Sequence, residues 1–310
     1  MLSRVAEALY WIGRYVERAE DTGRLLEVHL NAVLEDPWGD EDAACQDVLR
    51  VMGLKSEGGP TDAHGTTQRL AFARDSTSSI CGALVGAREN ARGVRDSLSS
   101  ELWECLNSTY HALGAQEEAS DRFGAYSFLR YVRERAAVVT GLVDGSMPRD
   151  DGWHFFVLGR SLERVDMTTR LLWVRGGRGS GPSWSELLKC CSAYEAYLRT
   201  YRSAVDPDKV MEFLLVDRLF PRSVFAALVQ AETCLAGLDP TAGRLGVDDE
   251  ARRLLGKART DLEFRRVADL FDELPVLLNA LQRTCADVGD AVADRYFAHG
   301  TSTAWAVDAI

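Results

Sequence analysis

The stretch YWIGRYVERAEDTGRLL, residues 10–26, decides the fold class, because its apolar residues recur at the three- and four-residue spacing of an α-helix. One apolar stripe of this helix contains Leu9, Ile12, Val16, Ala19 and Leu26. A second apolar surface, on the opposite side, contains Tyr10, Trp11, Leu25 and Val28. Four charged residues lie within this second surface: Arg14, Glu17, Arg18 and Asp21. A helix with two apolar sides is buried on both, so these charges need partners inside the protein.

The same design returns in the second half of the chain. WIGRYVERAEDTGRLLEV (11–28) aligns with VLGRSLERVDMTTRLLWV (157–174), and SICGALVGA (79–87) aligns with SVFAALVQA (223–231). Matches that recur in the same order indicate two copies of one helical unit. The period is far longer than that of a solenoid, so we expect a fused pseudo-dimer.

The two copies are predicted to be residues 1–149 and 150–310, which together form one intertwined domain. Strand signals are almost absent, and the chain is therefore predicted to be an all-α helical bundle around a pseudo-two-fold axis. The helical ranges expected from apolar periodicity are 2–34, 41–53, 67–96, 99–114, 121–143, 152–175, 183–204, 207–216, 221–236, 248–259 and 263–297.

Composition narrows the classes of function. The 310 residues are 46% hydrophobic and 27% charged, which is typical of a globular protein. The net charge of -11 argues against binding to nucleic acid or to an anionic membrane, which needs a basic surface. No apolar run is long enough to span a bilayer, and no secretion signal is visible, so a cytoplasmic location is expected. The seven cysteines, without a C-x-x-C pair, are expected to be buried and reduced, and a redox role of the adjacent Cys190 and Cys191 stays open.

The second copy repeats the charged surface with Arg160, Glu163 and Arg164. If the two helices pair about a local two-fold axis, Glu17 is expected to contact Arg160 or Arg164. The reciprocal contacts then join Glu163 to the arginines of the first copy. Such contacts would explain why large apolar residues surround these charges.

Two interpretations of this charged surface remain open. Paired charges can form a buried ionic network that fixes how the two halves dock. Alternatively, four arginines against two glutamates leave positive charge to spare, and guanidinium groups suit a carboxylate or a phosphate. The arginines concerned are Arg14, Arg18, Arg160 and Arg164.

A second polar cluster contains Arg88, Glu89, Arg92 and Arg95 at helical spacing. The equivalent segment of the second copy, AETCLAGL (231–238), lacks the arginines. The cluster is therefore either a site that one half has retained or a solvated helix surface. The five histidines have no metal-binding spacing, and no nucleotide-binding motif is present, so we expect no metal and no cofactor in this chain.

Four segments together resemble the alpha-E domain family, a bacterial all-helical family named for its Glu-Arg motif. They are MLSRVAEALYWIGRYVERAEDTGRLL (1–26), ARENARGVRDSLSSELWECLN (87–107), LGRSLERVDMTTRLL (158–172) and FLLVDRLFPRSV (213–224). The resemblance runs from Met1 to about Phe297. In place of the family's frequent Asn-Thr-Ala, this chain has Asp-Thr-Gly at 21–23.

Carried over residue by residue, the Glu-Arg motif falls on Glu17-Arg18 and again on Glu163-Arg164. The flanking arginines are Arg14 and Arg160, and a Pro-Arg-Ser element contains Arg222. Proteins of this family are typically encoded beside, or fused to, a circularly permuted ATP-grasp protein. The resemblance therefore implies a subunit of a peptide or amide ligase system, in which the partner holds the ATP and Mg²⁺.

Three hypotheses follow. The chain is a scaffolding subunit that docks the ligase and binds its anionic substrate, a peptide or an amino acid. Alternatively, it is an enzyme for acyl or peptide transfer or hydrolysis, in which Glu17 or Glu163 acts as acid or base and the arginines hold the anion. The third hypothesis is a structural adaptor or homodimer whose ionic network binds no ligand.

Overall fold

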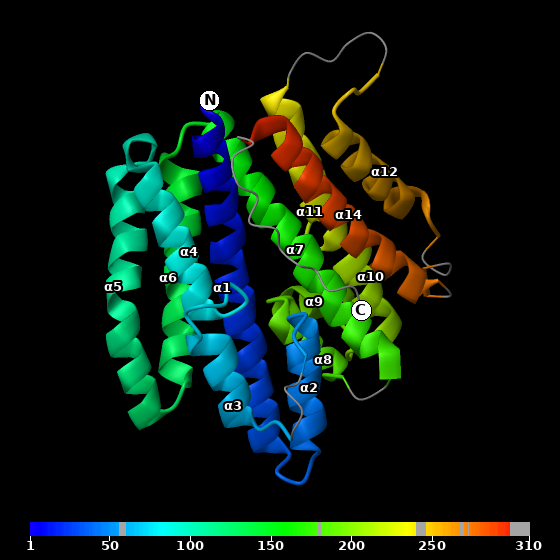
Figure 1. Cartoon of the computed structure of the whole chain (residues 1–310). Coiled ribbons are helices and arrows are strands. Elements are labelled where there is room, and N and C mark those ends of the chain that lie inside the picture. Colours follow the sequence, from blue (N-terminus) through cyan, green and yellow to red (C-terminus); the bar gives the residue numbers. More distant parts are fainter. Residues whose placement is uncertain (56–59, 179–180, 240–245, 267–269, 272, 298–310) are drawn as a thin grey trace.

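Two long helices, α1 (Ser3–Glu35) and α7 (Asp151–Arg178), form the centre of the molecule. The computed structural model describes residues 1–55, 60–178, 181–239, 246–266, 270–271 and 273–297, and these residues contain helices and no strand. The predicted all-α class is therefore confirmed. Figure 1 shows α1 and α7 side by side between two outer groups of helices. No helix of the described residues has the length and apolar composition needed to cross a membrane.

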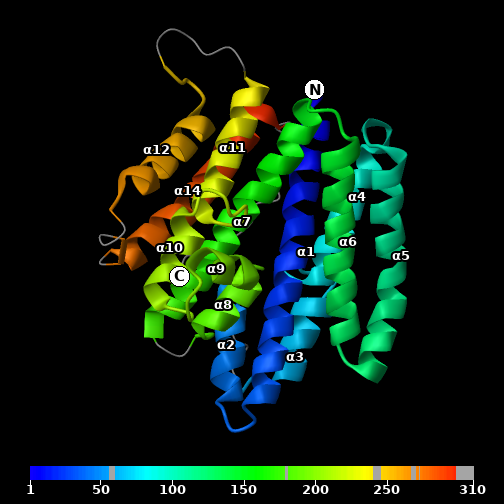
Figure 2. The same ribbon diagram turned by 180° about the vertical axis from the view of Figure 1, so that it is seen from behind.

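The outer helices are arranged in the same way around each central helix. The helices α4 (Ile80–Gly93) and α6 (Tyr126–Ser146) pack on α1, and α5 (Ser100–Phe123) packs on both of them. On the other side, α11 (Val224–Leu238) and α14 (Leu274–Tyr296) pack on α7, and α12 (Glu250–Phe264) packs on both (Figure 2). This parallel arrangement agrees with the repeat in the sequence, although the duplication itself stays a prediction.

Short elements fill the ends of the bundle. They are α2 (Glu41–Val51), α3 (Ala63–Thr67), a π-helical turn (Gln68–Phe72), a 3-10 turn (Arg95–Ser97), α8 (Trp184–Cys190), α9 (Tyr194–Tyr201) and α10 (Pro207–Val216). The helix α2 contacts both α1 and α7, and α8 contacts α1. One continuous apolar core extends through both halves.

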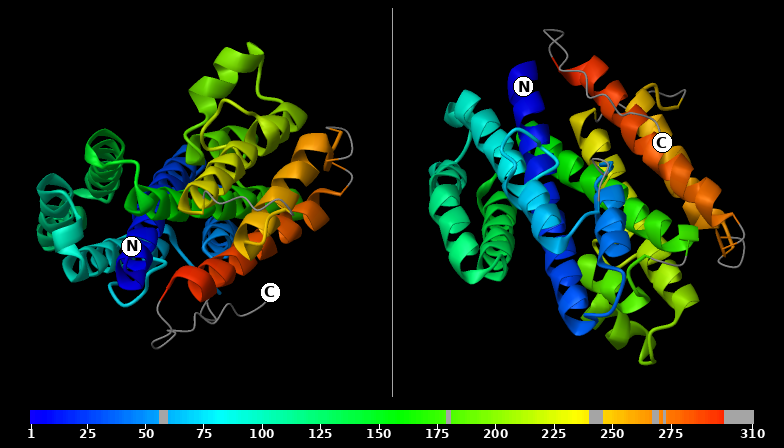
Figure 3. Two further views of the ribbon diagram at one scale, coloured as in Figure 1. Left: turned by 90° about the horizontal axis from the view of Figure 1, so that it is seen from above. Right: turned by 60° about the horizontal axis from the view of Figure 1, so that its bottom comes forward.

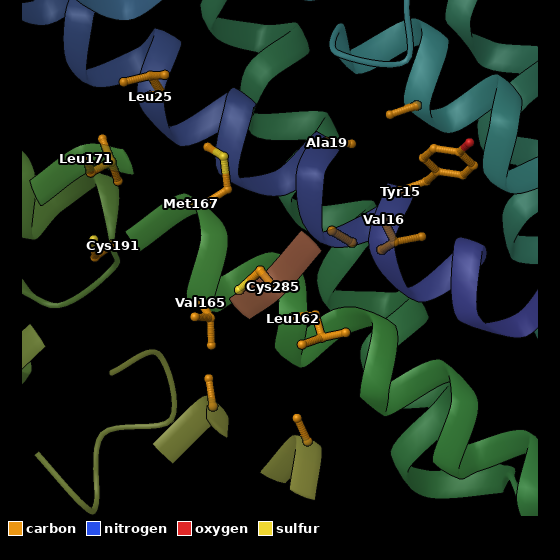
Figure 4. Packing of buried hydrophobic residues seen from close by; sticks show 14 of the residues in the cluster. Tyr15, Val16, Ala19, Leu25, Leu162, Val165, Met167, Leu171, Cys191 and Cys285 are labelled. Atoms are coloured by element: carbon orange, nitrogen blue, oxygen red, sulfur yellow. The ribbon is translucent and has the colours of Figure 1, made fainter. Parts of the chain in front are cut away.

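Both apolar sides of α1 are buried, as the sequence predicted. Helices α4 and α6 cover one part of its surface and α7 covers another. Figure 4 shows Met167 pointing from α7 toward α1 and Val165 pointing away from α1. The central position of α1 explains why its charged residues lie among large apolar side chains.

Two predicted helices are interrupted in the structure. The helix expected over 67–96 is broken by a turn, because Ser79 begins α4: its hydroxyl accepts a hydrogen bond from the N–H of Gly82 and donates to the carbonyl of Ala73. The helix expected over 183–204 is divided into α8 and α9. Ser192, between them, has a left-handed backbone with φ of 54°.

Other helix boundaries also differ from the prediction. The helix expected over 99–114 continues to Phe123, so the predicted break before 121 is wrong. The helix expected over 263–297 begins at Leu274, where a proline occupies the first turn. Parts of the segments between predicted helices, 54–66 and 237–247, lie outside the described residues.

The helices α1 and α7 approach each other at two glycines. A Cβ atom on Gly13 would lie 2.1 Å from the carbonyl oxygen of Phe156. A Cβ atom on Gly159 would lie 2.1 Å from the carbonyl oxygen of Tyr10. The two backbones therefore touch at reciprocal positions, where only glycine fits. Figure 3 shows the two helices from above and from an oblique direction.

We predict that Gly13→Ala or Gly159→Ala lowers the free energy of unfolding by about 2 kcal/mol or more, because the added methyl group forces two backbones apart. Gly114→Ala is the control, since this exposed position in α5 has no atom within 4 Å of the new Cβ. The control is expected to raise stability by about 0.5–1 kcal/mol, the usual gain of alanine over glycine in a helix. Urea unfolding measures both changes, and equal effects of the central and control variants would contradict the close approach.

Candidate functional site

Glu163 of α7 is held by two arginines of α1. The Nε of Arg14 donates to Glu163 Oε2 at 2.6 Å. Arg18 binds the same carboxylate through two donors, Nε to Oε1 at 2.5 Å and Nη2 to Oε2 at 2.9 Å. The side chain of Glu163 is only 1% exposed. The predicted contact between Glu163 and the first copy is therefore present, and all of its charge is compensated from the other central helix.

Glu17 of α1 is held in a related but different way. Arg164 of α7 donates from Nε to Glu17 Oε1 at 2.7 Å and from Nη2 to Oε2 at 3.1 Å. The second arginine on Glu17 is Arg222, whose Nη1 lies 2.8 Å from Oε1. Arg160 makes no direct contact with Glu17, so one of the two contacts predicted as alternatives is present and the other is not.

Arg222 joins three carboxylates of α1. Besides Glu17, its Nη1 lies 2.7 Å from Asp21 Oδ1, and its Nη2 lies 2.8 Å from Glu20 Oε1. The next residue, Ser223, caps α11 by accepting a hydrogen bond from the N–H of Ala226. The cap fixes the start of α11, so Arg222 connects the α10–α11 loop to α1. Spacing along α1 did not reveal the roles of Glu20 and Asp21.

Burial and charge act in opposite directions on the central glutamates. Burial alone would raise the pKa of Glu163, but the nearby Arg18 and Arg14 outweigh it and lower the pKa to about 2. Burial alone would likewise raise the pKa of Glu17. Arg164 and Arg222 outweigh this effect, so the pKa of Glu17 is also lowered. A buried carboxylate that stays ionised is poorly suited to proton transfer near neutral pH. The catalytic role of both glutamates stays a prediction, and this geometry favours a structural one.

Asp21 differs from these glutamates. Burial is the largest cause that raises the pKa of Asp21 to about 8; Arg222 opposes it, and the negative charges of Glu17 and Glu20 add to it. Asp21 shares Arg222 with Glu17 and Glu20, so this guanidinium does not overcome the burial of the Asp21 carboxyl. Arg24 supplies a further charge, with Nη2 2.7 Å from Glu20 Oε1.

Arg88 and Arg92 lie apart from the central ion pairs, on α4. The guanidinium of Arg88 lies 4.9 Å from the ring centre of Tyr110 and 5.6 Å from that of Trp103, both on α5. Glu89 bridges Arg88 and Arg92. The side chain of Arg92 is 63% exposed, so this cluster is open to a partner in a way that the central glutamates are not.

The remaining polar groups offer little chemistry. All seven cysteines are free and buried. Burial raises the pKa of the Cys191 thiol to about 12, which disfavours a reactive thiolate, and it also raises the pKa of Cys190. In the described part of the chain, no group of three or more His, Cys, Asp or Glu side chains is placed to hold a metal ion.

A family model described as a predicted alpha-helical domain with a conserved ER motif matches residues 1–297, and two ER pairs of the chain, Glu17-Arg18 and Glu163-Arg164, lie at the crossing of α1 and α7. The chain belongs to the Alpha-E family. The Alpha-E match does not include residues 298–310.

Similar curated proteins are uncharacterized. They include Mb2597 of Mycobacterium bovis and MT2643 and Rv2567 of Mycobacterium tuberculosis, each 26% identical over 320 residues. The match covers 93% of this Alpha-E chain but 36% of each relative, so the chain spans about a third of their length. No solved structure matches the chain.

We predict that Glu163→Gln lowers the free energy of unfolding by about 3–5 kcal/mol, because it leaves Arg14 and Arg18 without their shared negative charge. The control is Glu118→Gln, whose side chain is 76% exposed and 3.9 Å from Arg122, and which is expected to change stability by less than about 0.5 kcal/mol. Calorimetric melting separates the hypotheses. A catalytic glutamate predicts lost turnover with an unchanged melting temperature, and a structural one predicts a large drop in melting temperature.

The raised pKa of Asp21 predicts a pH dependence of stability. An unfolded aspartate titrates near pH 4, and the folded one near 8, so folding takes up a proton between these values. Stability is therefore expected to fall as pH rises through this window, by on the order of 1 kcal/mol per pH unit. Asp21→Asn removes this dependence, whereas Asp121→Asn, at an exposed position of α5, keeps it. Urea unfolding from pH 5 to 8 measures the slopes, and identical slopes for wild type and Asp21→Asn would contradict the prediction.

Proposed function

We propose that this Alpha-E chain is a helical subunit of an ATP-grasp amide or peptide ligase system. In this proposal the chain docks the ligase and binds an anionic substrate, a peptide or an amino acid, with its arginines. The partner is a circularly permuted ATP-grasp protein that holds ATP and Mg²⁺ and activates the carboxylate. The Alpha-E chain itself contributes binding and orientation.

The observation that carries the proposal is the length of the mycobacterial relatives. The Alpha-E region makes up 36% of each, so it is joined there to further polypeptide of nearly twice its own length. A covalent connection keeps two domains at high effective concentration, as expected for domains that work together. The resemblance of this sequence to proteins encoded beside ATP-grasp ligases supports the identity of that partner.

The geometry supports a binding role over a catalytic one. The central glutamates are 1% exposed and each is bound by two arginines, which makes α1 and α7 a rigid frame. The exposed Arg92 is joined through Glu89 to Arg88, which lies over Trp103, so α4 and α5 offer a surface with cationic and aromatic side chains. Arginine and aromatic residues are enriched at protein interfaces. We therefore expect the ligase to contact this surface.

The proposal predicts that the chain and its cognate ATP-grasp protein co-elute in size-exclusion chromatography, and that the chain changes the rate of ADP release by the ligase. Arg92→Glu is expected to weaken the complex by about tenfold, because it places a negative charge where the partner meets Arg88. Arg130→Glu is the matched control: this arginine of α6 is 71% exposed and lies 3.7 Å from Glu134.

Separate elution of the two wild-type proteins, together with an unchanged rate of ADP release, would refute the proposed function. Equal binding by Arg92→Glu and Arg130→Glu would refute only the α4–α5 contact.

A further inference from the structure

Arg14 of α1 and Arg160 of α7 lie at equivalent positions, and each guanidinium lies at the same distance from an aromatic ring. The guanidinium carbon of Arg14 lies 5.9 Å from the ring centre of Tyr10, and that of Arg160 lies 5.9 Å from the ring centre of Phe156. Both arginines lie one residue beyond a glycine of the helix crossing. The two side chains differ in the acceptors that their N–H groups reach.

Arg14 has two strong acceptors. Its Nε donates to Glu163, and its Nη1 donates to the hydroxyl of Tyr10 at 3.1 Å. Arg160 has lost both equivalents. Phe156 has no hydroxyl group, and the equivalent carboxylate, Glu17, is already occupied by Arg164 and Arg222. By analogy with the pair Arg14–Glu163, Arg160 would be expected to bind Glu17. Arg222 occupies that position on Glu17 instead.

Arg160 consequently has a buried N–H donor without an acceptor. The residue is 9% exposed, and its Nε is buried without a hydrogen-bond partner. Its Nη1 donates to Asp144, whose Oδ2 lies at the long distance of 3.4 Å. A buried cationic donor that lacks an acceptor costs free energy, so the site favours the arrival of an anion.

The surroundings of Arg160 add positive charge and a further donor. Asp144 is 41% exposed and is shared with Arg149, whose Nη1 lies 3.6 Å from Oδ1. Arg149 lies over Trp153, 4.2 Å from its ring centre. The indole N–H of Trp153 is buried without an acceptor, and this residue is seven positions before Arg160 on the same helix. Two arginines thus share a single, partly exposed carboxylate, and a buried indole N–H without an acceptor lies on the same helix as Arg160.

We propose that Arg160, assisted by Arg149, binds a carboxylate of a ligand, and that Asp144 is an internal competitor that the ligand displaces. The expected group is a carboxylate because Arg18 and Arg164 each bind one through Nε and Nη2, the edge to which the unpartnered Nε of Arg160 belongs. This inference rests on the proposed function, for which it specifies where the acidic substrate or an acidic side chain of the partner is held.

The test is isothermal titration calorimetry of the full chain with succinate, and separately with inorganic phosphate, at constant ionic strength. Wild type is expected to bind succinate in a saturable manner and more tightly than phosphate. Arg160→Gln is expected to weaken succinate binding by at least about tenfold, because it removes a charge-assisted bond. Asp144→Asn is expected to strengthen it by about two- to fivefold, because the competing charge of a partly exposed ion pair is lost.

Arg130→Gln is the control, since it removes an exposed arginine of the same helix as Asp144, and it should bind succinate like wild type. If Arg160→Gln does not fold, Asp144→Asn still tests the proposal. An unchanged affinity of this variant for succinate would show that Asp144 does not compete with the ligand, and would overturn the proposal. Absent binding by wild type, tighter binding of phosphate, or equal binding by Arg160→Gln would each overturn the site. Co-elution with the ATP-grasp partner is measured separately, so a ligase complex that forms without succinate binding refutes this inference and leaves the proposed function standing.

Discussion

The direct contact between the backbones of α1 and α7 is the constraint on which the rest of the structure depends. Gly13 and Gly159 let each helix reach a carbonyl oxygen of the other, and the side chains that flank this contact are thereby brought across the interface. Glu163 then accepts from arginines of α1, and Glu17 accepts from an arginine of α7. With larger residues at the crossing, the helices would separate, and these short charge-assisted bonds would be lost.

The ionic network is better understood as a device for specifying geometry than as a source of net stability. Removing carboxylates and guanidinium groups from water is costly, and good pairing does little more than offset that cost. Its value lies in directionality, since a carboxylate held at two oxygens by Arg18 permits one register of α1 on α7. The frame therefore presents its outer surfaces, including that around Arg92, in fixed positions.

The sequence predicted the parts of this arrangement that depend on a single periodicity. The two apolar sides of α1 indicated a buried helix, and the repeated Glu-Arg pairs indicated that Glu163 would meet arginines of the other copy. It did not predict that Arg222 would replace Arg160 on Glu17, because that contact joins a loop and a helix that lie more than 200 residues apart in the sequence. Helical periodicity identifies residues that share one face of a helix. It does not show whether a residue from a third element binds that face. The turn at Ser192 was missed for a related reason. Its left-handed backbone interrupts the helix without a change in the apolar periodicity of the sequence.

The position of Arg222 also bears on how the two halves can be used. In the alignment of the halves, Ser78 occupies the place of Arg222, so a symmetric assembly of two first halves would have no side chain to bridge Glu17, Glu20 and Asp21. Arg24 would still pair with Glu20, but Asp21 would lose the guanidinium that binds it and would lie buried beside two further carboxylates. The first half therefore depends on an arginine of the second half to pair the buried Asp21, a contact that an assembly of two first halves would lack.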